Sequence, residues 1–363
     1  MGRCGMSRFL FIIPTLSRGG AERVVSVLSS SLARVGAEAL VIKYYDTPEE
    51  YVTDAGVRIF NLSGGDRRAY EKMSYPQRIL ALRKAIAGLH PDFVIPFMFS
   101  IARDVSIASV GLRCTVIQSI RINPAIAPAS RLQRKWRDYL VYRSKCTFVQ
   151  NEKQRQYFRK RKETIHVLYN PVSENLLGVS PSFSNTVFTV SAAGRLERQK
   201  NFRLLIDSFC QAFQEGTPAI LNIYGEGSLA QELSAYVAVQ NRAGSIRLMG
   251  RSECMEEVYR GSDLFVLSSD FEGMPNALIE AMACGLPCVS TDCPTGPSDL
   301  IEDGVNGLLV PVRDPAAMAR AIRRIYDDRD ASHEMGRKAK ETVAEKCDAV
   351  KIAREIISIC ENL

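Results

Sequence analysis

Two glutamates that stand eight residues apart, Glu272 and Glu280, are the residues of this chain best placed to do chemistry. They belong to the segment 271–280, which reads Phe-Glu-Gly-Met-Pro-Asn-Ala-Leu-Ile-Glu. The apolar run before it predicts a buried strand, and the Ala-rich run after it predicts a helix whose first turn suits Pro275. The turn between them would offer backbone N–H groups at the carboxyl end of a strand, where anions bind. A phosphate held by this backbone, with carboxylates on either side that accept hydrogen bonds from sugar hydroxyls, would make this a nucleotide-sugar site. The motif alone also fits a surface glutamate followed by a glutamate on a helix face.

A basic pair follows an earlier apolar run, Val187 to Val190. The segment 194–201 reads Gly-Arg-Leu-Glu-Arg-Gln-Lys-Asn, which predicts a turn between a strand and a helix. Arg195 and Lys200 would stand at the mouth of that turn. Cations there can stabilise the charge that a leaving diphosphate gains as its bond breaks. Two exposed cations at the start of a helix are the alternative.

Two glycine-rich turns also follow apolar runs. Gly19 and Gly20 come after Phe9–Ile13, and Gly225-Glu226-Gly227 comes after residues 220–224. Glycine lets backbone N–H groups approach a phosphate closely, although an ordinary loop is the alternative for the first turn. The second turn fits the dinucleotide pattern G-x-G-x-x-A. The acidic residue expected about 20 positions later is missing from the end of the next strand, so a dehydrogenase is the weakest interpretation.

In these four segments, and in their order along the chain, the sequence resembles the retaining glycosyltransferases of family 4. The resemblance implies an α/β chain with the GT-B fold, in which two Rossmann-like domains face each other across a cleft. It implies that residues 1–170, with a C-terminal helix at about 348–363, bind the acceptor. Residues 171–347 would bind the nucleotide-sugar donor.

The resemblance also assigns roles. Arg195 and Lys200 would hold the diphosphate without a metal, Glu272 would lie near the donor sugar, and Glu280 would bind the ribose hydroxyls. No cofactor is expected. The other donor-binding residues that the resemblance implies are Gly19, Gly20, Gly194, Gly225, Gly227, Gly250, Arg251, Gly273, Met274, Pro275, Asn276 and Ala277.

One departure from the family concerns the first domain. Many members place a histidine after the strand that here ends at Gln118, whereas this chain reads Ser-Ile-Arg-Ile-Asn-Pro from 119 to 124. With Arg121 at that position, no side chain is an obvious acceptor base. This fits a front-face mechanism in which the leaving phosphate takes the acceptor proton. Arg121 and Arg23 are acceptor-side candidates, and a surface arginine in a loop is the alternative for Arg121.

Charge is divided unevenly along the chain. Residues 1–180 hold 28 Lys and Arg against 14 Asp and Glu, whereas the remainder holds 19 against 26. The basic stretches at 131–137 and 155–162 suit an anionic membrane surface or a phosphorylated acceptor, with solvated helix faces as the alternative. No nucleic-acid motif is present. The ten scattered cysteines and three histidines match no metal pattern, which predicts reduced, buried thiols in a cytosolic protein.

The resulting prediction is a transferase that moves a hexose or N-acetylhexosamine to a glycan acceptor. A UDP-sugar donor is favoured over a GDP-sugar. The segment 292–299 resembles a loop of bacterial enzymes that assemble surface polysaccharides. This favours a polyprenyl-diphosphate-linked acceptor and a cytoplasmic protein that is peripheral on the inner membrane face. A nucleotide-sugar epimerase on the same fold and a non-catalytic nucleotide- or glycan-binding subunit are the alternatives.

Alternating apolar and amphipathic segments predict the elements that position these residues. We expect a linker at 167–172 and a helical C-terminus over about 315–360. Helices are expected at 21–35 and 77–88. Strands are expected at 9–13, 39–44, 57–60, 93–97, 115–118, 147–150, 187–191, 219–224, 245–249, 264–268, 287–290 and 308–310.

Overall fold

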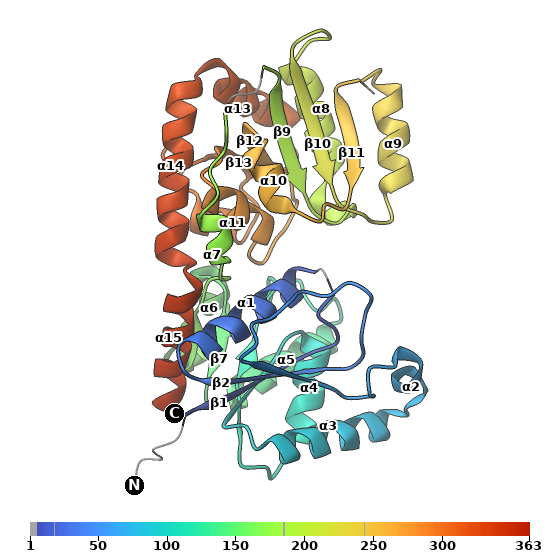
Figure 1. The fold of residues 1–363 in the computed structure, drawn as a ribbon, viewed down its shortest axis with the longest axis vertical. Helices are drawn as coiled ribbons and strands as arrows, with labels where there is room; N and C mark the ends of the chain where they lie inside the picture. Colours follow the sequence, from blue (N-terminus) through green and yellow to red (C-terminus); the bar gives the residue numbers. More distant parts are fainter. Residues whose placement is uncertain (1–5, 18, 184–185, 243) are drawn as a thin grey trace. The chain divides into compact units, whose positions relative to one another are not determined.

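The computed structural model describes residues 6–17, 19–183, 186–242 and 244–363. The chain divides into two compact units (Figure 1). The first runs to Pro171 and also includes Ala349–Leu363, and the second is Val172–Asp348. Each unit is an α/β structure built on a parallel sheet.

The first unit is built on a five-stranded parallel sheet in the order β3-β2-β1-β4-β5. Its central strand is the most apolar, and Phe9 to Ile13 are fully buried. The strands are β1 (Arg8–Ile13), β2 (Glu38–Lys43), β3 (Val57–Asn61), β4 (Phe93–Pro96) and β5 (Thr115–Val116). The helices that accompany them are α1 (Gly20–Arg34), α2 (Arg67–Lys72), α3 (Tyr75–Leu89) and α4 (Phe99–Ala108).

A second, three-stranded sheet in the same unit differs from the sequence prediction. The single strand expected at 115–118 is divided at Ile117, and its second part pairs in another sheet. Val167, expected in a linker, is the last residue of a strand. The elements are β6 (Gln118–Ser119), β7 (Thr147–Val149), β8 (Ile165–Val167), α5 (Arg131–Arg143), α6 (Glu152–Tyr157) and the 3₁₀ helix η1 (Arg159–Thr164). The side chains of Lys160, Arg161 and Lys162, part of an expected basic stretch, lie outside the described residues.

The last helix, α15 (Ala349–Glu361), packs on the first unit, beside α1 (Figure 1). Its apolar face, with Ile352, Ala353 and Ile356, is buried in the core that β1 and α1 also form. Ile356 stands four positions after Ile352 and three after Ala353, so the three side chains lie on one face of the helix, the face that packs on the core.

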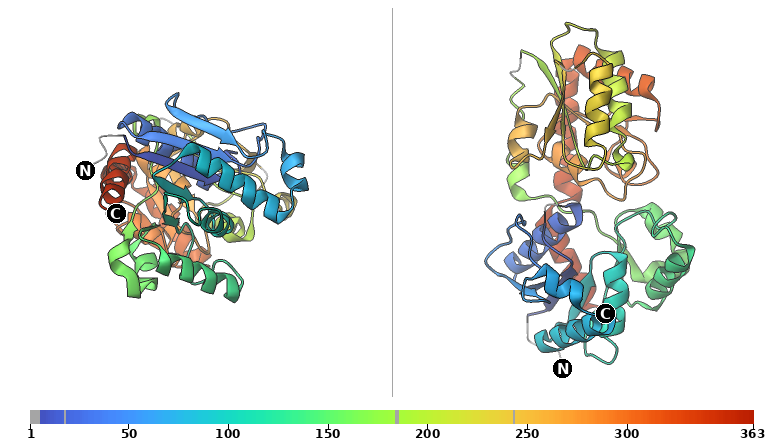
Figure 2. Two further views of the ribbon diagram at one scale, coloured as in Figure 1. Left: turned by 90° about the horizontal axis from the view of Figure 1, so that it is seen from below. Right: turned by 90° about the vertical axis from the view of Figure 1, so that its right-hand side faces the viewer.

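The second unit contains a six-stranded parallel sheet in the order β11-β10-β9-β12-β13-β14. Helices α8 and α9 lie side by side (Figure 2). The strands are β9 (Phe188–Ala193), β10 (Ala219–Tyr224), β11 (Ile246–Gly250), β12 (Leu264–Leu267), β13 (Cys288–Thr291) and β14 (Leu308–Val310). The helices are α7 (Glu174–Leu177), η2 (Arg198–Lys200), α8 (Phe202–Ala212), α9 (Ala230–Val239), α10 (Met255–Arg260), α11 (Asn276–Ala283), α12 (Pro297–Leu300), α13 (Pro315–Asp327) and α14 (Arg329–Lys346).

We expect the contact of α15 with the first unit to contribute strongly to stability. Ile356→Ala removes a side chain that is 1% exposed and should lower the free energy of unfolding by about 2–4 kcal/mol. Arg354→Ala, on the exposed face of the same helix, is the matched control. Urea denaturation measures both variants. Equal midpoints for the two would contradict the buried position of Ile356.

Candidate functional site

The strand order of the second unit places a site at one edge of the sheet. Chain order along the sheet reverses between β9 and β12, which are neighbours. In open parallel sheets, ligands bind outside the carboxyl ends of the strands at such a reversal. The loop after β9 contains residues 194–201, and the loop after β12 contains residues 268–275. Both segments singled out in the sequence therefore meet at this point.

The two loops are joined by an ion pair between Lys200 and Glu272. Lys200 Nζ donates to Glu272 Oε1 at 2.7 Å, and the two side chains are 15% and 8% exposed. Backbone contacts run in parallel, since Asp270 N donates to the Gln199 carbonyl at 2.9 Å and Ser268 Oγ donates to the Lys200 carbonyl at 2.7 Å. A largely buried pair held by such contacts has one preferred geometry.

Further hydrogen bonds hold the carboxylate of Glu272. Ser269 Oγ donates to Oε1 at 2.6 Å, and Gln199 Nε2 donates to Oε2 at 3.4 Å and to the Phe271 carbonyl at 2.8 Å. Thr295 Oγ1 donates to the backbone carbonyl of Glu272. The predictions did not include Ser269, Gln199 or Thr295. Each lies in or beside a segment that the sequence singled out: Ser269 ends the apolar run before Glu272, and Gln199 and Thr295 belong to the segments 194–201 and 292–299.

Arg195 differs from Lys200 in its surroundings. It is exposed, and its guanidinium makes no hydrogen bond or ion pair with the part of the chain that the structure describes. Glu197, two positions further on, accepts hydrogen bonds from the N–H and hydroxyl of Ser228 at 3.1 and 3.0 Å. These bonds lower the pKa of Glu197. Arg195 is therefore a cation at the carboxyl end of β9 that is available to an anion.

The glycines of the Gly225 turn are required by a close approach of backbones. A Cβ on Gly225 would lie 1.9 Å from the Gly194 carbonyl oxygen, and one on Gly227 would lie 2.5 Å from the Leu196 carbonyl oxygen. Leu196 N also donates to the Glu226 carbonyl at 2.8 Å. The turn after β10 thus packs directly on the turn that carries Arg195. This explains the two glycines without a dinucleotide.

The turn between the two glutamates is held by the loop that follows β13. A Cβ on Gly296 would lie 2.8 Å from Pro275 Cδ and 3.0 Å from the Gly273 carbonyl oxygen, so the two loops are in close contact. Pro275 was expected in the first turn of the helix. It instead precedes α11 as the N-cap, in an extended conformation with φ −80° and ψ 101°. Its carbonyl can then accept from Leu278 N and Ile279 N, both at 3.1 Å.

Asn276 and Ala277 begin α11, as expected, and Glu280 lies one turn further along it. Glu280 is 6% exposed and accepts a hydrogen bond of 2.9 Å from the hydroxyl of Tyr259, which is fully buried. The tyrosine lies on α10 and was not among the predicted site residues. At the end of β11, the Gly250 carbonyl accepts from Gly225 N at 2.7 Å, which places Gly250 and the exposed Arg251 next to the Gly225 turn.

The remaining predicted residues lie in the first unit, which has its own reversal between β1 and β4. Gly19 is the N-cap of α1, and Gly20 is the first residue of that helix. Arg23 is one turn further along, with its guanidinium 5.9 Å from the centre of the Tyr51 ring. These residues follow the carboxyl end of β1.

Arg121 follows β6 and lies over the ring of Phe97, the residue after β4, at 4.5 Å. Its guanidinium donates to Ser119 Oγ at 2.7 Å and to Asn170 Oδ1 at 3.0 Å. Burial lowers its pKa to about 10, which still leaves it protonated at neutral pH. No described carboxylate pairs with Arg121, so its charge is met only by neutral groups and an aromatic ring.

Among the described residues, the cysteines are free thiols, and no group of three His, Cys, Asp or Glu side chains could hold a metal ion. Cys4 lies outside the described residues. Burial raises the pKa of the Cys146 and Cys293 thiols to about 12, which makes both unreactive near neutral pH. No helix in the described part of the chain is both long and apolar enough to cross a membrane.

Known proteins resemble this chain in sequence, over part of its length or nearly all of it. Residues 187–328 match the family model described as Glycosyl transferases group 1. A Campylobacter jejuni protein is 27% identical over 344 residues, which cover 93% of each chain. Its name is GalNAc-alpha-(1->4)-GalNAc-alpha-(1->3)-diNAcBac-PP-undecaprenol alpha-1,4-N-acetyl-D-galactosaminyltransferase. Another from that organism is 27% identical over 369 residues, 97% of this chain and 99% of its own; it is named N-acetylgalactosamine-N,N'-diacetylbacillosaminyl-diphospho-undecaprenol 4-alpha-N-acetylgalactosaminyltransferase.

The fold has known counterparts as well. The crystal structure of Anabaena HepE in complex with UDP matches with a TM-score of 0.81 at 19% identity, covering 98% of this chain and 100% of that one. The sheets and this match define a GT-B fold, which confirms the predicted fold class. The region that matches the group 1 glycosyl transferase model contains Arg195, Lys200, Glu272 and Glu280.

We expect the Lys200–Glu272 pair to stabilise the second unit only as a pair. Glu272→Leu leaves a largely buried ammonium group without its carboxylate and should lower the free energy of unfolding by about 3–5 kcal/mol. The double variant Lys200→Met with Glu272→Leu should recover a large part of that loss. Denaturant unfolding of the wild type, both single variants and the double variant measures the coupling. Additive losses would contradict it. The exposed pair Glu334–Arg337 is the control, and Glu334→Gln should leave the midpoint unchanged.

Proposed function

We propose that this chain is a retaining glycosyltransferase of family 4. It transfers a hexose or N-acetylhexosamine from a nucleoside-diphosphate sugar to a glycan acceptor, with a UDP-sugar favoured over a GDP-sugar. The observation that carries the proposal is the Lys200–Glu272 pair, which joins the loops after two adjacent strands at the sheet reversal, with Arg195 in the first of these loops. Two cations and a fixed carboxylate at this edge suit a diphosphate joined to a sugar.

The two cations would act on the leaving group. As the bond between the anomeric carbon and the diphosphate oxygen breaks, Arg195 and the Lys200 ammonium would stabilise the charge that the diphosphate gains. Lys200 is already paired, so a bound diphosphate would share it with Glu272. No metal is needed in this arrangement. In a front-face mechanism the acceptor oxygen bonds to the anomeric carbon on the same side, and its proton passes to the leaving phosphate.

The acceptor we propose is a glycan linked to a polyprenyl diphosphate, in the assembly of a surface polysaccharide. The names of the two Campylobacter relatives support this class, because both contain an undecaprenol joined through a diphosphate. The excess of Lys and Arg in residues 1–180 suits an anionic acceptor in the first unit. We also propose that the protein works in the cytoplasm, peripheral on the inner face of the cell membrane.

Arg195→Ala should lower kcat/KM for the donor by about 30- to 1000-fold, as loss of one transition-state donor does in other enzymes. Arg198→Ala removes another exposed arginine from the same loop and is the matched control. Binding of UDP-, GDP- and ADP-sugars would be measured without added metal, for the wild type and for Glu280→Ala. Proton NMR of the product tests retention of anomeric configuration. Normal turnover by Arg195→Ala, or no binding of any nucleotide sugar by folded wild type, would overturn the proposal.

Arg121 should act on the acceptor. Because charge-assisted hydrogen bonds contribute about 1.5–3 kcal/mol, Arg121→Gln should raise the acceptor KM by roughly 10- to 100-fold and the donor KM much less. Arg121→Lys keeps the charge but loses the planar guanidinium fork, so its acceptor KM should lie between those of the wild type and Arg121→Gln. Arg113→Gln, an exposed arginine of the same unit, is the control. Equal effects on both substrates would point to a structural role for Arg121.

A further inference from the structure

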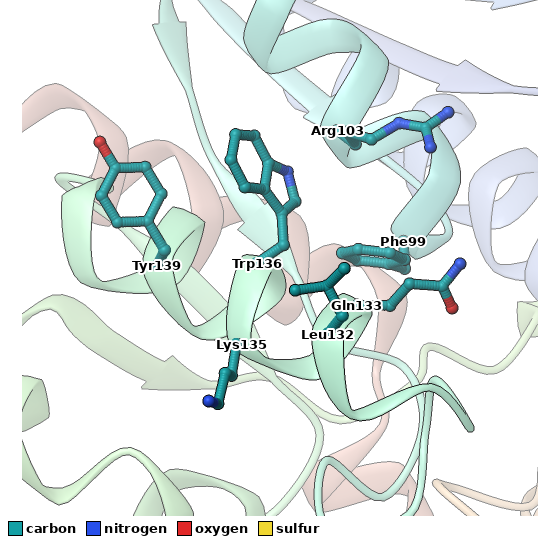
Figure 3. A pocket seen from close by; sticks show the side chains of 7 residues that line it. All are labelled: Phe99, Arg103, Leu132, Gln133, Lys135, Trp136 and Tyr139. Carbon is teal, nitrogen blue, oxygen red and sulfur yellow. The ribbon is translucent and has the colours of Figure 1, made fainter.

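An apolar depression of about 510 Å³ opens on the first unit between α4 and α5 (Figure 3). Leu132, Trp136 and Tyr139 stand at i, i+4 and i+7 on α5, so they share one stripe of that helix. They are 77%, 42% and 53% exposed, and Trp136 and Tyr139 contact each other with ring centres 5.7 Å apart. In Figure 3, Leu132 and Phe99 of α4 lie together below Trp136. Several large apolar side chains gathered on one exposed helix face mark a binding surface.

The charges of α5 are sorted between its two faces. Arg137 is 4% exposed, donates to the carbonyls of Pro124 and Ala127, and pairs with Asp138. Arg134 donates to the carbonyls of Pro128 and Ala129, both at 2.7 Å. These two arginines are therefore structural. They hold the loop that precedes α5.

Three other basic residues of α5 remain on its exposed side. Arg131, Lys135 and Arg143 are exposed and form no ion pair with any residue that the structure describes. The only acidic residue of the helix, Asp138, already pairs with Arg137. An aromatic and aliphatic stripe flanked by unpaired cations is the pattern of a helix that lies in the headgroup region of an anionic bilayer.

We propose that the α5 surface, made of Phe99, Leu132, Lys135, Trp136 and Tyr139, docks the protein on an anionic lipid bilayer. The apolar stripe would enter the interface, and Arg131, Lys135 and Arg143 would contact lipid phosphates. The choice of a bilayer rests on the proposed function, because a polyprenyl-linked acceptor is held in one. A protein partner would be expected to cover the stripe without a requirement for anionic lipid.

Trp136 is the only tryptophan of the chain, so its fluorescence reports on this surface alone. Vesicles of phosphatidylcholine mixed with phosphatidylglycerol should shift its emission to shorter wavelength, and brominated lipid should quench it. Vesicles of pure phosphatidylcholine should do neither. Unchanged emission with both kinds of vesicle, together with no co-sedimentation, would overturn the proposal. Concentration-dependent self-association as the only change at Trp136 would also overturn it and assign the surface to a second copy of the chain.

Two variants locate the contact. Arg131→Gln combined with Lys135→Gln should weaken vesicle binding about 5-fold for each charge removed. Leu132→Ser should also weaken it, whereas Val239→Ser, which alters a 78% exposed side chain of the second unit, should not. Binding of UDP-sugar by each variant is measured separately. Retained UDP-sugar binding without vesicle binding by the wild type would reject the docking surface and leave the proposed donor site intact. Wild-type affinity in both α5 variants would overturn the assignment.

Discussion

The ion pair between Lys200 and Glu272 is the interaction on which the arrangement of the site depends. The two residues are separated by 72 positions in the chain, and only the adjacency of β9 and β12 brings their loops together. At 15% and 8% exposure, neither charge is well solvated, so each needs the other. Hydrogen bonds beside the pair also fix the backbone. The Lys200 carbonyl and the Gln199 carbonyl both accept from the loop that contains Glu272. A shift of either strand would break all of these contacts at once.

Close backbone packing is the second constraint, and it explains why glycines surround the site. Gly225, Gly227 and Gly296 each stand where a Cβ would overlap a neighbouring loop. The loops after β9, β10, β12 and β13 therefore support one another at the same edge of the sheet. Rigid support of this kind holds a charged group in one orientation, which a site must do if it stabilises charge as it develops.

Much of the fold and part of the site could be predicted from local patterns. Apolar runs located the long strands, and the sheet reversal brings together the loop that contains Arg195 and Lys200 and the loop that contains Glu272 once those strands are placed. The second sheet of the first unit was missed because β6 and β8 have two and three residues, too short for a periodicity signal. Tyr259 and Thr295 were missed for another reason. Their contacts with Glu280 and Glu272 arise from tertiary packing: no local motif marks Tyr259, and the segment 292–299 did not reveal which of its residues contacts Glu272.

The basic residues of the first unit show why net charge alone does not locate a binding surface. Arg134 and Arg137 satisfy backbone carbonyls of the loop before α5, and Arg155 pairs with Glu152, so these three cations are already engaged within the chain. Arg121 is different, because its half-buried guanidinium contacts neutral oxygens and the Phe97 ring. Burying an unpaired guanidinium costs free energy that a folded chain must recover elsewhere. Under the proposed function, a bound anionic acceptor would supply the counter-charge that no described carboxylate gives to Arg121.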